Sequence, residues 1–208
     1  MLLDEELNDI IAPTLQFCHD WMHAIFVNGV FNVITFLLCK ALKNACVSDV
    51  YSRFEHYIAT WVLPRRLGSS KQLSSMFSKK RETADEKAKV FKCQASDGLT
   101  AIAVIAVYVQ KVFMKAGLAI AECTAFLHLA NIVDLLVAVP SGRIQPDTLR
   151  DSIGPFLDSC VAAGWRARMI PKFHWLVHAP RHLHSGRCFY RASCTRGSTG
   201  WSSGIPMT

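Results

Sequence analysis

Apolar side chains recur at helical spacing through most of the chain, and polar breaks divide this pattern into segments. The clearest amphipathic stretch runs from Val50 to Trp61, where the apolar positions follow one helix face. Ser48 or Asp49 can cap its start, and Pro64 ends it. The spacing therefore predicts a helix in this stretch.

The preceding apolar stretch, from Leu15 to about Ala45, predicts one or two helices with a break near Asn28–Gly29. β-Branched residues are concentrated between Val30 and Leu37, and such residues favour strands. A short strand at this position is therefore an alternative to a helix.

Helical spacing returns in the second half of the chain. From Leu99 to Val139 it predicts two helices that are broken at Gly117 and ended by Pro140–Gly142. Residues Asp147–Ala163 predict another helix, although this stretch contains Gly-Pro in its interior.

Together these segments predict a mainly α-helical protein, an irregular helical bundle with room for one or two short strands. Four parts follow from the changes in composition. They are a helical N-terminal part (1–63), a basic, serine-rich connecting segment with at most short helices (64–98), a second helical part (99–184) and a disordered tail (185–208).

The apolar composition, with 51% hydrophobic residues and a mean hydropathy of +0.22, raises the question of a membrane span. A spanning helix needs roughly 20 consecutive apolar residues. Ala24–Cys39 is too short, and charged and polar side chains interrupt Ala101–Ala138. We therefore predict buried helices and no stable membrane span.

The cysteines and the N-terminus bear on the compartment. The 8 cysteines are dispersed and include no Cys-x-x-Cys pair, which favours free thiols in a reducing compartment. Acidic residues occupy positions 4–6, where a secretory signal needs a basic region. We expect an intracellular protein.

The net charge of +7 is concentrated in residues 61–98 and 140–208. Lys79, Lys80 and Arg81 form a basic run that could contact DNA phosphates, and the neighbouring Phe77 could stack on a base. A solvated loop or a nuclear import signal is the alternative explanation. DNA is accordingly a candidate partner.

Asp20 and His23 lie in the most specific short string of the sequence, just before a strongly apolar segment. A carboxylate there could bind a divalent cation, because such ions prefer oxygen ligands. From the spacing alone, however, Asp20 is better explained as the N-cap of the following helix.

His174 and His178 are four residues apart, so on a helix they share one face and could bind zinc or another transition metal. Pro180 limits the helix, and no glutamate follows His174 as a metalloprotease would require. A structural role is therefore favoured from the sequence.

Short motifs in the chain resemble a known family. The Asp-x-Met-His element at 20–23, followed by Asn-Gly-Val at 28–30, resembles the second-aspartate region of CACTA-type and related eukaryotic cut-and-paste transposases. The strings at 91–99 and 170–178 agree with this resemblance, which extends over about residues 17–184.

In that family three acidic residues on an RNase H-like core hold two metal ions. The resemblance therefore implies Mg²⁺ at Asp20, with DNA and further copies of the chain as partners in the nucleus. Only Asp20 carries over from a matching motif, and Glu122 is a third acid by position alone. The first acid would lie upstream of Met1, so the resemblance implies a truncated and inactive transposase fragment.

The apolar pattern ends abruptly at His184. Codons for residues 184–201, when read two bases later, can spell a continuation that resembles the family, which predicts a frameshift at this point.

The alternative interpretation of the whole chain is a non-enzymatic α-helical interaction protein or a membrane-associated protein.

Overall fold

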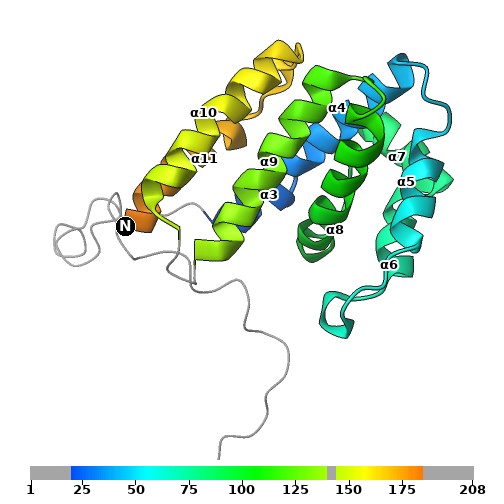
Figure 1. Ribbon diagram of the computed structural model, residues 1–208, viewed down its shortest axis with the longest axis horizontal. Coiled ribbons are helices and arrows are strands. Elements are labelled where there is room, and N and C mark those ends of the chain that lie inside the picture. Colours follow the sequence, from blue (N-terminus) through cyan, green and yellow to red (C-terminus); the bar gives the residue numbers. More distant parts are fainter. Residues whose placement is uncertain (1–19, 140–143, 185–208) are drawn as a thin grey trace, which may run out of the picture.

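The computed structural model describes residues 20–139 and 144–184, and within these ranges every regular element is a helix. The prediction of a mainly α-helical bundle is confirmed (Figure 1). The predicted tail and frameshift after His184, and the helix end at Pro140–Gly142, lie outside the described residues. The α-helices are α3 (Trp21–Phe26), α4 (Val30–Asn44), α5 (Val50–Ala59), α6 (Ser70–Ser74), α7 (Lys79–Ala88), α8 (Ala95–Tyr108), α9 (Ile120–Ala138), α10 (Pro146–Ala162) and α11 (Pro171–His184).

The strand considered for Val30–Leu37 is wrong, because these residues form the first half of α4. Their side chains are buried all around the helix. The low helix propensity of β-branched residues costs only a few tenths of a kcal/mol each, whereas burying a Val or Ile side chain contributes about 1.5–3 kcal/mol. Packing in the centre of the bundle therefore outweighs local preference.

The predicted break at Asn28–Gly29 separates α3 from α4. A Cβ atom at Gly29 would lie 2.2 Å from the carbonyl oxygen of Ala24, so only glycine fits at this sharp turn. The side chain of Asn32 then accepts a hydrogen bond from the Gly29 N–H at 2.9 Å and thereby caps α4.

The core is built around α4. Figure 1 shows α10 and α11 at one side of the molecule and α5 to α7 at the other, with α4, α8 and α9 between them. Phe31 packs its ring against those of Phe91 and Phe126, while Phe54 and Phe77 extend the aromatic core toward α5. All five rings are buried.

The other predicted helices are confirmed with shifted ends. The stretch from Val50 to Trp61 contains α5, and Asp147–Ala163 corresponds to α10. The break at Gly117 is present: α8 continues into a π-helix at Val109–Met114, and Gly117 adopts φ +72° in the turn before α9.

Within residues 20–139 and 144–184, three helical stretches are long and apolar enough to cross a membrane by length and composition alone, namely Trp21–Asn44, Ala95–Met114 and Ile120–Ala138. The first stretch, Trp21–Asn44, contains Ala24–Cys39, which we considered too short to span a membrane from the sequence. It is longer because helical residues extend it at both ends. In the fold, 78% of its most apolar window is buried, against 39% and 44% for the other two.

Candidate functional site

Asp20 lies at the N-cap of α3, and its side chain is exposed. Its Oδ1 accepts a hydrogen bond from the Met22 N–H at 2.9 Å, which is the capping arrangement that the sequence offered as an alternative to metal binding. His23, one turn into α3, is exposed as well.

A two-metal site needs several converging oxygen ligands. Within residues 20–139 and 144–184, no group of three or more His, Cys, Asp or Glu side chains is close enough to hold a metal ion. The described donors around Asp20 therefore do not fit a catalytic metal pair, and Mg²⁺ at Asp20 stays a prediction. Glu122 lies in the first turn of α9 and lines a hollow that also contains basic side chains.

The basic run lies at the start of α7. Lys79 pairs with Glu82 at 2.8 Å, and the Arg81 guanidinium donates to the carbonyl oxygen of Lys92. Lys80 is exposed. Lys79 and Arg81 thus each have one partner within the fold and keep further N–H donors.

Phe77 cannot stack on a base, contrary to the sequence interpretation. Its ring is fully buried, with its centroid 4.9 Å from that of Phe91 and 5.0 Å from that of Phe54. The segment between residues 64 and 98 is therefore anchored in the core through this aromatic side chain.

Two neighbouring hollows lie beside the exposed side of α4, and we call them together the α4 groove. The smaller measures about 140 Å³ and the larger about 350 Å³, and both are lined by Phe36, Lys40 and Lys89. The larger also reaches Asn44 and the residues before α11, including Trp165. The groove thus joins α4 to the end of α7, the start of α9 and the connection between α10 and α11.

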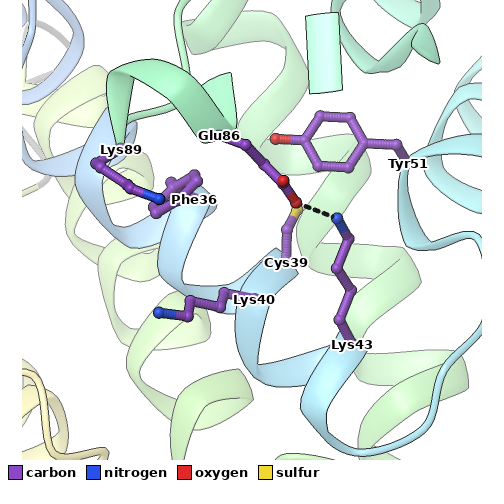
Figure 2. Close-up of a pocket in the computed structure, with 7 residues that line it drawn as sticks. All are labelled: Phe36, Cys39, Lys40, Lys43, Tyr51, Glu86 and Lys89. Carbon is purple, nitrogen blue, oxygen red and sulfur yellow. Dashed lines mark hydrogen bonds and ion pairs between the residues drawn. The ribbon is translucent and has the colours of Figure 1, made fainter. Parts of the chain in front are cut away.

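Acidic side chains neutralise one end of the α4 groove. Lys43 forms an ion pair with Glu82 at 2.6 Å. It forms a second with Glu86 at 2.5 Å, which Figure 2 shows. Burial tends to raise the pKa of Glu82, but hydrogen bonds from Lys43 and Lys79 outweigh it and hold that pKa below its ordinary value. These pairs fix Lys43 and withdraw its charge from the groove.

Beneath this end lies a buried polar cluster. The carboxylate of Asp85 accepts hydrogen bonds from the Lys92 N–H at 3.1 Å and the Tyr51 hydroxyl at 3.3 Å. Burial raises the pKa of Asp85, Tyr51 and the nearby Cys39 thiol. Because Cys39 stays protonated, it is not a nucleophile for groove chemistry.

Basic side chains dominate the other end of the α4 groove. In Figure 2 the ammonium groups of Lys40 and Lys89 lie on one side of Glu86, and Lys43 lies on the other. Arg168 approaches from the α10–α11 connection, where its guanidinium donates to the carbonyl oxygen of Lys89 at 2.7 Å. Lys40, Lys89 and Arg168 are all exposed, so three cations from three elements surround one hollow.

His174 and His178 come together on α11, as predicted from their spacing. Their Nε2 atoms are 2.9 Å apart, and their rings are nearly perpendicular at 85°. Lys172, at the start of the same helix, donates to the carbonyl oxygens of His23 and Val27 and so joins α11 to the end of α3.

The sequence did not single out the basic end of the α4 groove. Lys40, Lys89 and Arg168 lie in three different segments, and no local pattern relates them. Comparison with known proteins adds no relative: no family model matches the chain, and no curated protein or solved structure is significantly similar to it.

Proposed function

We propose that the chain is an inactive fragment of a DNA transposase and that it retains the capacity to bind the phosphate backbone of nucleic acid. Its ancestral activity would be metal-dependent DNA strand cleavage and transfer in the nucleus. The single observation that carries the binding proposal is the gathering of Lys40, Lys89 and Arg168 around the 350 Å³ hollow of the α4 groove.

The chemistry of the groove is suited to a phosphodiester. Exposed ammonium and guanidinium groups attract phosphates, and they release counterions when the phosphates bind. The acidic end is internally paired through Lys43. In the larger hollow three cations face one described carboxylate, that of Glu122, so the charge balance there is positive. Trp165 and Phe36 provide apolar walls, but both are buried, and we assign no base stacking to them.

The basic run lies at the opposite end of α7 from the α4 groove, and none of its side chains lines either hollow. Lys79–Arg81 opens α7, and Lys89 follows the last residue of that helix. At 1.5 Å and 100° per residue, Lys80 and Lys89 are separated by about 13.5 Å along the axis and lie on opposite faces of the helix. Lys80 therefore offers a separate phosphate contact on another face of α7 and does not extend the α4 groove.

The test is fluorescence anisotropy of a labelled 20-base-pair duplex with the full chain at low salt. A variant that combines Lys40→Gln, Lys89→Gln and Arg168→Gln should bind at least about tenfold more weakly, because each phosphate contact contributes to affinity. The matched control replaces Lys71, Lys111 and Lys115, which are exposed and line neither hollow. Equal loss of affinity in the two triple variants would mean that binding depends on net charge and not on the α4 groove.

The ancestry is tested separately by the genomic DNA and the transcript, read from well upstream of Met1 through the codon for His184. An upstream frame that encodes a metal-binding acid, together with a shifted frame that resumes the family pattern, is the result we expect. A single intact frame across His184 that is matched in related genes would contradict the frameshift.

A second candidate function is association with a membrane or another apolar partner. The observation in its favour is the length and apolar composition of α8, α9 and the stretch Trp21–Asn44, together with exposed valines such as Val107 and Val137. Detergent-dependent solubility and flotation with neutral lipid vesicles, with no response to DNA, would favour it over the transposase fragment.

A further inference from the structure

Two imidazoles meet on the outward face of α11. His174 is exposed and His178 is half-buried, and the 2.9 Å between their Nε2 atoms is a hydrogen-bond distance. One ring therefore donates to the other, and both Nε2 atoms point to the same place. This convergence is independent of the α4 groove.

We propose that His174 and His178 form a chelating site for a divalent transition metal, with Nε2 of each ring as a ligand. Imidazole suits Zn²⁺, Ni²⁺ and Cu²⁺, whereas Mg²⁺ and Ca²⁺ prefer oxygen. The site is therefore different in kind from a magnesium site at Asp20. In the part of the chain that the structure describes, no group of three or more His, Cys, Asp or Glu lies close enough to hold a metal ion, so the proposed site draws two ligands from it.

The geometry needs little change to accept the ion. Zn–N bonds of about 2.0–2.1 Å at a tetrahedral angle separate two ligand nitrogens by roughly 3.4 Å. The observed 2.9 Å must widen by about half an ångström, which small rotations of two side chains provide. The ring that donates through Nε2 must change to the tautomer with its proton on Nδ1, so that both Nε2 atoms can bind the metal. Two neutral rings make this change without losing a proton.

The backbone that carries the pair is held by packing. Phe173 and Leu176 are buried on the opposite face of α11, and the ring of Phe173 stacks on that of Phe156 in α10 at 6.0 Å. Lys172 fastens the start of the helix to α3. The two imidazoles are therefore presented together before a metal arrives, which favours chelation over binding by a single ring.

The test is isothermal titration of the full chain with NiCl₂, using the variants His174→Gln and His178→Gln. Each should bind roughly 100-fold more weakly than the wild type, because a second ligand on the same scaffold acts at high effective concentration. His56→Gln is the matched control, since His56 is an exposed histidine on α5, and it should leave the affinity unchanged within twofold. Far-UV circular dichroism of each variant verifies that the helices are intact.

A second measurement links binding to the folded helix. Ni²⁺ should raise the thermal unfolding midpoint of the wild type and of His56→Gln, and it should leave that of His174→Gln unchanged, because the pair exists only when α11 is formed. Wild-type affinity in His174→Gln would overturn the proposal. So would loss of binding in His178→Gln with no loss in His174→Gln, because the metal would then be held without His174.

Discussion

The buried amide of Asn32 holds α4 to two other segments, and its removal should be among the most destabilising single changes in the chain. Its Oδ1 accepts from the Gly29 N–H at 2.9 Å, and its Nδ2 donates to the carbonyl oxygen of Phe91 at 2.9 Å. The backbone reinforces this link, since the Phe91 N–H donates to the carbonyl oxygen of Asn32 at 3.1 Å. Asn32 itself is only 1% exposed.

Asn32→Ala leaves the Gly29 N–H and the Phe91 carbonyl without their side-chain partner. Each buried polar group that loses its partner costs about 1–3 kcal/mol. The higher helix propensity of alanine offsets roughly half a kcal/mol of this loss of stability. The net loss in the free energy of unfolding should therefore be about 1.5–5.5 kcal/mol, a large fraction of the usual 5–15 kcal/mol.

The assay is urea unfolding followed by far-UV circular dichroism, with Asn44→Ala as the matched control. Asn44 is the last residue of the same helix and is exposed, so its replacement should change stability by less than about 0.5 kcal/mol. If Asn32→Ala loses less than about 1 kcal/mol, or no more than Asn44→Ala, the amide does not hold α4 in the way described.

Three further changes test other parts of the fold by urea unfolding. Gly98→Ala places a Cβ 2.7 Å from the Phe26 ring, and it should cost about 1–2 kcal/mol net of helix propensity, whereas Ser96→Ala on the exposed side of α8 should be nearly neutral. Lys172→Met keeps the aliphatic stem but removes the hydrogen bonds to α3, and it should cost about 1–2 kcal/mol; an unchanged urea midpoint would contradict this. The pKa of Glu82 is held below its ordinary 4.5, so its stabilising effect is present above pH 4.5 and is lost as the pH falls through the lowered pKa. The difference in urea midpoint between the wild type and Glu82→Gln should therefore shrink in acid, and a pH-independent difference would refute the assignment.

Helix periodicity predicted most of the elements because the apolar faces are local patterns. The helix at α5, the break at Gly117 and the helix at α10 could all be read from spacing and turn residues. The stretch after Gly29 was ambiguous because it is rich in β-branched residues, which favour strands. Only its place at the centre of the bundle decides for the helix.

The candidate sites also differ in whether they depend on local sequence or on tertiary packing. The N-cap role of Asp20 and the shared face of His174 and His178 depend on residues close in sequence, and the structure shows both arrangements. The basic end of the α4 groove depends instead on tertiary packing. Lys40 and Arg168 line one hollow only because α10 packs against α9 and α11 packs against α3, which no local pattern encodes. Phe77 was misassigned for the opposite reason, since a basic neighbourhood in sequence concealed a buried position.

The most direct test of phosphate-backbone binding in the α4 groove is the salt dependence of duplex affinity for the wild type, Lys89→Gln and Lys111→Gln. Each phosphate contact contributes roughly −0.9 to the slope of log K against log salt concentration for duplex DNA. Lys89→Gln should therefore reduce the magnitude of the wild-type slope by about one, and Lys111→Gln should leave it unchanged. A wild-type slope near zero, or the same slope in all three proteins, would contradict backbone binding at this groove.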